Sequence, residues 1–207
     1  MDSKWYLSLN SWLQKADQNY IEGRLLWLNW LVNGASNLLW LSLEQMIKIL
    51  LLQKRIDSLS SQVNNLDDLH NLLDSEGKKI GHNVHDLIQQ IKKMYPDLDI
   101  DKFEETLKKL QEYFYRRYVV NSRSSISLLM LDNVDKLYFL LRSKVDSDIG
   151  PGTIDEIFIQ RKYNWWHPLS AFAYAYLQNK YFKTRKHREI KYSAFDGTGK
   201  TYTENGT

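Results

Sequence analysis

The sequence contains no cysteine, and this absence excludes disulfide bonds and thiolate metal sites. It also has only three prolines and nine glycines in 207 residues. Folds made of short strands and tight turns need many such residues, so their scarcity favours long helices. We find no internal repeat and no low-complexity segment, and therefore expect an all-α protein.

We expect no segment of the chain to span a membrane. The most apolar stretch, 25–52, is interrupted by three asparagines, a glutamine, a glutamate and a lysine, and such side chains are costly within a bilayer. Residues 1–4 lack the charged-then-apolar order of a secretory signal. Together with the lack of cysteine, these features predict a cytoplasmic protein that does not enter a membrane.

The charge balance is only mildly basic, with a formal net charge of +3 and a pI near 8.8. General nucleic-acid binders are usually more basic, so any such binding has to depend on a local patch. The hydrophobic fraction of 43% and the aromatic fraction of 13% are enough for a sizeable core rich in aromatic rings. The length predicts one domain, or one domain with an appendage.

Hydrophobic periodicity and end signals predict a series of helices. Ser11 is a suitable N-cap for the first helix, and Asn33 and Gly34 suit its end. Pro96 sets the end of a later helix, and residues 76–79 are expected to form a turn. The predicted helices cover residues 11–32, 36–56, 63–73, 83–95, 102–120, 126–145 and 170–181.

The C-terminal part of the chain differs from the rest. Residues 150–152, with the sequence Gly-Pro-Gly, predict a linker, and alternating residues around an Asp-Gly pair predict a β-hairpin over 190–204. We therefore expect a helical bundle at 1–148 and, packed on it, an extension at 149–207 that holds a helix and the hairpin. The predicted fold class is all-α, an up-and-down bundle of about five helices.

Two runs of residues form one paired signature. In the first, Glu44 and Lys48 stand four residues apart on one face of a mostly apolar helix. In the second, Gly81 and His82 precede a polar N-cap that opens the next helix. These runs resemble the HEPN family, a set of small helical domains linked to nucleotide and RNA binding. The resemblance covers roughly residues 5–145 and implies that His82 helps lock a pair of helices together.

Each of these residues has a structural and a functional interpretation. Glu44 and Lys48 form a satisfied polar pair, which is the commoner case, or Lys48 faces a cleft and binds phosphate, which the resemblance favours. We predict that His82 is structural and lies near Glu44, although its titration near neutral pH leaves an acid–base role open. His85 and Asp86 follow closely, but no third ligand is evident, so we predict no metal and no cofactor.

Arg116, Arg117 and Arg123 lie at or just past the end of a predicted helix. Catalytic HEPN domains carry an arginine in this region and, after four to six further residues, a histidine. Here residues 121–124 contain no histidine, so the expected proton acceptor for RNA cleavage is missing. Arginine remains suited to phosphate. The resemblance therefore implies a non-catalytic member that binds a nucleotide or RNA through these arginines and Lys48, with a solvated helix end as the alternative.

A second basic run occupies residues 183–188, beside Tyr181 and Phe182. Aromatic and basic side chains together suit nucleic-acid binding. Charge runs are more often solvated, however, so both interpretations stay open.

Three classes of function follow. The leading one is a non-catalytic HEPN-like domain that binds a nucleotide, RNA or a protein partner; the resemblance implies a toxin–antitoxin or defence system with a nucleotidyltransferase partner. The second is a metal-independent ribonuclease whose base is His82, His85 or His167. The third is a structural dimerisation module. We expect a homodimer, because one five-helix core has little room for all of the following side chains: Trp27, Trp30, Trp40, Trp165 and Trp166.

Overall fold

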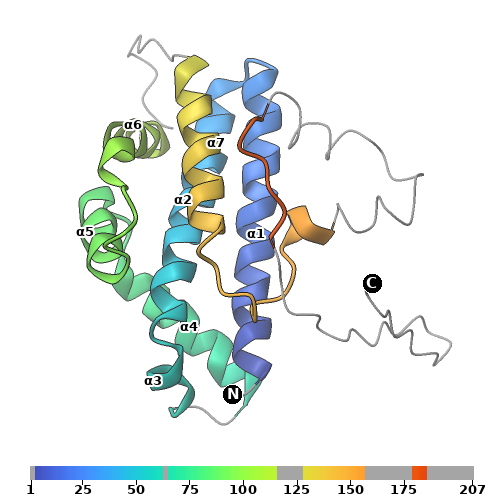
Figure 1. Ribbon diagram of the computed structural model, residues 1–207, viewed down its shortest axis with the longest axis vertical. Coiled ribbons are helices and arrows are strands. Elements are labelled where there is room, and N and C mark those ends of the chain that lie inside the picture. Colours follow the sequence, from blue (N-terminus) through green and yellow to red (C-terminus); the bar gives the residue numbers. More distant parts are fainter. Residues whose placement is uncertain (1–2, 63–64, 116–127, 157–178, 186–207) are drawn as a thin grey trace, which may run out of the picture.

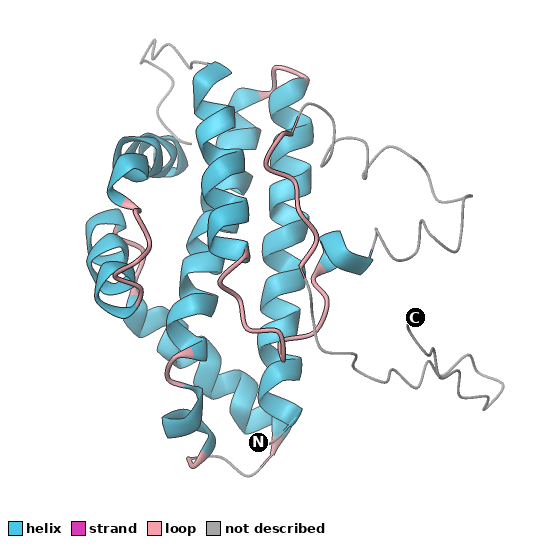
Figure 2. Cartoon of the chain, viewed as in Figure 1, coloured by secondary structure: helices cyan, strands magenta, loops and turns pink. Residues whose placement is uncertain are grey.

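The computed structural model describes residues 3–62, 65–115, 128–156 and 179–185 (Figure 1). Within these residues the chain is helical apart from its loops and turns, and it contains no strand (Figure 2). The predicted all-α class is therefore confirmed for the described part, whereas the predicted hairpin at 190–204 lies outside it. The elements in order are α1 (Ser3–Leu28), α2 (Val32–Gln53), α3 (Ile56–Ser60), α4 (Leu66–Ile80), α5 (Val84–Met94), the 3₁₀-helix η1 (Asp101–Phe103), α6 (Glu104–Tyr115) and α7 (Leu128–Arg142).

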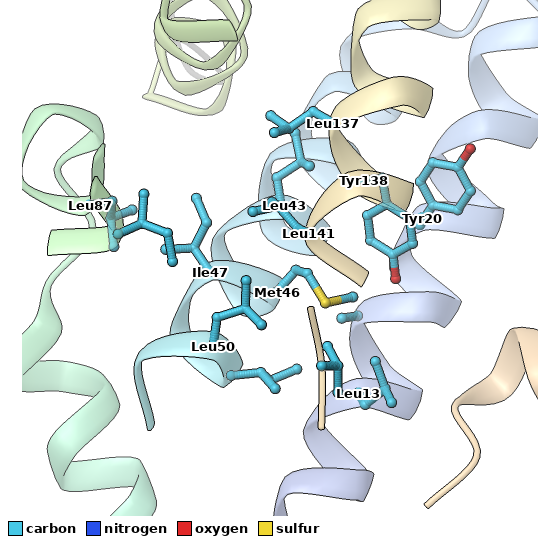
Figure 3. Packing of buried hydrophobic residues seen from close by; sticks show 14 of the residues in the cluster. Leu13, Tyr20, Leu43, Met46, Ile47, Leu50, Leu87, Leu137, Tyr138 and Leu141 are labelled. Carbon is cyan, nitrogen blue, oxygen red and sulfur yellow. The ribbon is translucent and has the colours of Figure 1, made fainter. Parts of the chain in front are cut away.

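Helix α2 lies at the centre of the molecule and contacts all the other long helices (Figure 1). It pairs most extensively with α1, the helix that precedes it. Leu43, Met46, Ile47 and Leu50 of α2 are almost completely buried and lie among side chains of α1, α5 and α7 (Figure 3). Because its neighbours surround it, α2 is apolar around most of its circumference, as its sequence predicts.

Helix α2 is also the one helix of the described part that is long and apolar enough to cross a membrane. However, 78% of its most apolar window is buried inside the protein. The core helix of a soluble protein has the same properties, and the charges of Glu44 and Lys48 near its middle would be costly in lipid. The helix therefore fits the core of a soluble protein.

The turn between α1 and α2 lies earlier than predicted. Trp30, not Gly34, takes the left-handed conformation, with a φ of 63°. The N–H of Leu31 donates to Leu26 O at 2.9 Å. The N–H of Trp30 donates to Trp27 O at 3.0 Å, which completes the bond pattern of a Schellman motif. Gly34 lies inside α2 instead, where the Leu26 side chain packs 3.2 Å from the position of a Cβ.

The start of α1 also differs from the prediction. The helix begins at Ser3, so Ser11 lies within it and is not its N-cap. The Ser11 hydroxyl donates to Ser8 O at 2.7 Å, one turn back. A serine that bonds in this way is compatible with a helix interior, and the prediction of a cap was therefore wrong.

Helix α4 is longer than the predicted span of 63–73. Residues 76–79 continue the helix instead of forming a turn. Gly77 allows α1 to come close, because a Cβ there would lie 2.5 Å from the Trp12 ring. The glycine thus serves the packing of two helices, which a single sequence does not distinguish from a turn signal.

The later helix boundaries agree better with the prediction. Asn83 caps α5, since its side chain accepts from the N–H groups of His85 and Asp86 at 2.9 and 3.3 Å. The helix ends before Pro96, as predicted. At Asp101 the chain enters the 3₁₀-helix η1 before α6, instead of starting an α-helix directly.

A buried charge network joins α1 to α7. The Arg142 side chain donates to Asp17 through Nε and Nη2, both at 2.9 Å, and to Asp155 at 2.7 and 3.1 Å. The Tyr138 hydroxyl donates to Asp17 at 2.6 Å. Burial alone would lower the pKa of Arg142, but the charges of Asp17 and Asp155 outweigh this effect and raise that pKa. The guanidinium therefore stays charged inside the protein.

A second network links the same two helices. Arg24 Nε donates to both oxygens of Asp135 at 3.0 Å. The Tyr20 hydroxyl donates to this carboxylate at 2.5 Å and accepts from Asn179 at 2.7 Å. The rings of Tyr20 and Tyr138 stack with their centroids 4.1 Å apart, so one aromatic contact connects the two networks.

The described residues of the C-terminal extension, 149–156 and 179–185, lie along α1 and α7 (Figure 1). Asp155 belongs to the first network, and the N–H of Ile154 donates to Asp17 at 3.0 Å. The extension therefore shares buried polar contacts with the bundle. A division of the chain at residue 148 stays a prediction.

We call residues 179–185 the strap. It is not helical, so the predicted helix at 170–181 does not reach its expected end; the earlier part of that range lies outside the described residues. Arg185 fastens the strap to the loop after α7. Its guanidinium donates to the carbonyl oxygens of Val145, Asp146, Ile149 and Gly150.

Replacement of Arg142 by methionine should lower the free energy of unfolding by about 3–5 kcal/mol, because it leaves the buried Asp17 without its cation and Asp155 with only the more distant Arg185. Urea denaturation followed by circular dichroism measures this loss. Lys109→Met is the control, since Lys109 pairs with Glu105 on the exposed face of α6 and such pairs contribute little. Equal losses in the two variants would contradict the importance of the network.

Candidate functional site

Glu44 of α2 contacts two basic side chains with one oxygen. Its Oε1 lies 2.8 Å from Lys48 Nζ and 2.7 Å from His82 Nδ1. Glu44 and Lys48 are 4% and 5% exposed, whereas the side chain of His82 is 58% exposed. Glu44 Oε2 is buried and has no hydrogen-bond partner among the residues that the structure describes. The carboxylate therefore ties α2 to the segment between α4 and α5.

The backbone around His82 is shaped by its neighbours. Gly81, which ends α4, has a φ of 82° that residues with a side chain rarely adopt. Gln111 of α6 donates to His82 O, and its side-chain oxygen accepts from the N–H of Val84 at 3.4 Å. Asn83 then caps α5. Contacts from α2 and α6 thus hold the imidazole at the start of α5.

The structure brings together the four residues of the predicted signature. It confirms the predicted contact between His82 and Glu44. Lys48 is buried with its ammonium on Glu44, which fits the interpretation as a satisfied polar pair. A phosphate group at Lys48 would have to compete with that carboxylate, so a binding role for Lys48 stays a prediction. Gly81 supplies the turn that the signature requires.

The other predicted site residues are not brought to this place. Arg116, Arg117 and Arg123 lie outside the described residues, and so does His167. His85 is exposed in the first turn of α5. In the part of the chain that the structure describes, no group of three histidine, aspartate or glutamate side chains is arranged to hold a metal ion.

A second candidate site, which the sequence did not reveal, is a pocket of about 320 Å³ at the C-terminal end of α7. It lies between the last turn of α7, the following loop and the strap. Three of its lining residues are cationic, three carry hydroxyl groups and none is acidic. The lining consists of Phe139, Arg142, Ser143, Val145, Ser147, Lys183, Thr184 and Arg185.

The three cations of this pocket differ in their surroundings. Arg142 binds two aspartates, and Arg185 covers loop carbonyls, so both also serve the fold. Burial, and after it the charge of Arg142, lower the pKa of Arg185 to about 10. Lys183 is exposed. The one sequence signal for the pocket was the basic run 183–188, whose last three residues lie outside the described part.

In comparisons with protein-family models, curated proteins and solved structures, nothing matches this chain. The comparisons therefore leave the HEPN resemblance untested. That resemblance depends on the residues of the paired signature and on the order of the helices. Function has to be argued from the two sites.

Replacement of His82 by alanine should lower the free energy of unfolding, at the lower end of a range of about 1–3 kcal/mol. The variant removes one of two donors to a buried carboxylate, but the imidazole itself is largely exposed. Thermal and urea unfolding measure the change, with His85→Ala as the control at an exposed position three residues later, in the first turn of α5. Unchanged stability combined with a lost binding activity would make His82 a functional residue instead.

Proposed function

We propose that the chain is a non-catalytic HEPN-like domain that binds a nucleotide or RNA through its phosphate groups. The observation that supports this proposal is the 2.7 Å contact between Glu44 and His82. The two runs that carry the resemblance stand 38 residues apart in the chain, and folding joins them around one carboxylate. Residues that matched the family by chance would have no reason to meet in this way.

The resemblance extends the proposal to the architecture and setting of the protein. It implies a helical bundle over roughly residues 5–145, and we propose that this is an up-and-down bundle of about five helices. The local sequence patterns add a C-terminal helix and a hairpin, and the composition adds a cytoplasmic location and a homodimer. A toxin–antitoxin or defence system is the expected context. The expected protein partner there is a nucleotidyltransferase, and binding of such a partner is the alternative to binding of RNA.

The second candidate is a metal-independent ribonuclease with His82 as its base, and the same contact supports it. Glu44 holds Nδ1 of the imidazole, and the exposed ring leaves the other nitrogen for a substrate. A histidine oriented by a carboxylate is a frequent general base. Such a reaction also needs a cation for the phosphate, and the nearby Lys48 is already paired with Glu44. The binding function is therefore the better supported of the two.

Joint replacement of Arg116, Arg117 and Arg123 by alanine should weaken binding of labelled single-stranded RNA and of a labelled nucleotide. Each lost phosphate contact also removes a counterion-release contribution, so the slope of log affinity against log salt should fall by about 2 for three contacts. Fluorescence anisotropy over a series of salt concentrations measures both quantities.

A matched control removes the same number of positive charges by replacing Lys102, Lys108 and Lys109 with alanine, each of which pairs with a carboxylate near α6. Equal affinity of the arginine variant and the unaltered protein would mean that the arginines are only solvated. We expect no cleavage of the same RNA on a gel. Cleavage that is lost in His82→Ala would favour the ribonuclease, and absence of both binding and cleavage would favour the structural dimerisation module.

We predicted a homodimer from the number of apolar side chains, but fewer of them are exposed than we expected. Trp27 and Trp40 are buried in the core, and residues 165–166 lie outside the described part. Trp30 is 77% exposed and Leu31 is 58% exposed, at the turn between α1 and α2. This tip is therefore the apolar surface of the described chain that a second copy would cover.

Light scattering at micromolar concentration should give the mass of a dimer, and Trp30→Gly should shift the protein towards the monomer. Glycine adopts the φ of 63° at this position without strain, so the variant removes the indole without harm to the fold. Tyr115→Ala, which removes an exposed aromatic ring from the end of α6, is the control. A strict monomer mass for the unaltered protein would refute the dimer.

A further inference from the structure

The pocket at the end of α7 has no part in the proposed function, yet it has the lining of a binding site. Its volume of about 320 Å³ lies in the range that small ligands occupy. The loop after α7 contributes Ser147, and the strap contributes Lys183 and Thr184. Lys183 and Thr184 are exposed, so these donors are accessible to a ligand from solvent.

The charged side chains among the described residues that line the pocket are all cationic. Arg142 and Arg185 both approach Asp155, at 2.7 and 3.9 Å, and Arg142 also binds Asp17. Asp146 adds a third negative charge that acts on Arg185, but none of these three carboxylates is among the described lining residues. The lowered pKa of Arg185 is the expected response to burial beside a second cation. An anion in the pocket would therefore meet cations and no carboxylate of the described lining.

The carbonyl groups at the end of a helix normally repel anions. Here three carbonyl oxygens of the last turn of α7, at residues 139, 141 and 142, accept from N–H groups of residues 143–145. The Arg185 guanidinium donates to four further carbonyl oxygens, in the loop that follows. These oxygens are therefore directed to a cation of the protein. An anion would meet ammonium and hydroxyl donors in their place.

We propose that this pocket binds the phosphate group of a small phosphorylated ligand. The Lys183 ammonium and the hydroxyl groups of Ser147 and Thr184 are its donors. The Ser143 hydroxyl already donates to Leu140 O at 2.7 Å, so it has no hydrogen left for the ligand in this orientation.

The rest of the lining indicates which kind of phosphorylated ligand the pocket accepts. Phe139 and Val145 form an apolar wall beside the donors. A phosphomonoester with a flat organic group uses both parts of the pocket, whereas a free phosphate uses only the donors. The described lining does not contain the three arginines of the proposed function, and the argument for the pocket does not depend on them.

Isothermal titration calorimetry of the full chain with pyrophosphate and with AMP tests this site, with sodium chloride at equal ionic strength as the blank. We expect saturable binding to one site. Lys183→Ala should weaken it about tenfold, since the ligand loses a charge-assisted hydrogen bond. Ser147→Trp should abolish it by filling the pocket without a change of charge. Arg142 and Arg185 are left unaltered because they hold the fold.

Lys180→Ala is the matched control, because Lys180 is an exposed lysine of the same strap that pairs with Asp132 and does not line the pocket. It should keep the affinity of the unaltered protein. Circular dichroism establishes that each variant is folded. Absence of binding at millimolar ligand, or equal losses in Lys180→Ala and Lys183→Ala, would overturn the proposal.

The Arg116, Arg117 and Arg123 triple variant separates this proposal from the proposed function. It should bind pyrophosphate as the unaltered protein does, whatever its affinity for RNA. Loss of pyrophosphate binding in this variant, with binding kept in Lys183→Ala, would assign the anion to the arginines and overturn the pocket. RNA binding can fail without any change at the pocket, and the reverse also holds.

Discussion

The pairing of Arg142 with Asp17 and Asp155 is the interaction on which the arrangement of this chain depends most. A guanidinium presents its donors in one plane, and carboxylates from α1 and from the extension occupy that plane. A charge left alone in the core costs several kcal/mol. The three segments that supply these charges therefore cannot separate one at a time without a large loss of stability. The pairing thus makes the bundle and the described part of the extension cooperative.

The apolar core and the charge networks contribute differently to the fold. Burial of apolar side chains around α2 supplies the larger share of the stabilisation. Buried ion pairs add little to stability compared with apolar side chains of the same size. These ion pairs instead select one arrangement of the helices, because Arg24 and Arg142 each contact their aspartate only when α1 and α7 lie in one register. The stacked rings of Tyr20 and Tyr138 require the same register.

Local patterns in the sequence predicted the helical class, the mostly apolar character of α2 and the polar cap that opens α5. They failed where one residue serves two segments that are distant in the chain. Gly34 and Gly77 are ordinary stop signals, but here they permit close contact between α2 or α4 and α1. Asp17 and Arg142 stand 125 residues apart, and no periodicity connects them. Packing between elements therefore overrides the local signal at these positions.

The two candidate sites likewise differ in how far the sequence predicted them. The contact of Glu44 with His82 was predicted because a family resemblance joined two runs that local patterns do not relate. The pocket at the end of α7 was missed because it combines two short segments, and neither one carries a motif. Within the basic run 183–188, the sequence did not distinguish Arg185, which turns to protein carbonyls, from Lys183, which stays exposed.

The balance of charge separates the two sites chemically. At Glu44, one carboxylate meets one ammonium and an exposed imidazole, and its second oxygen is buried without a donor. The donors that are described at this site are already directed to the carboxylate, and the carboxylate repels a phosphate. At the end of α7 the described residues that line the pocket include three cations and no carboxylate. A phosphate can therefore bind Lys48 only if the ion pair between Lys48 and Glu44 breaks. Lys183 is exposed and can bind a phosphate without any rearrangement. Of these two lysines, Lys48 thus requires the larger change in the protein.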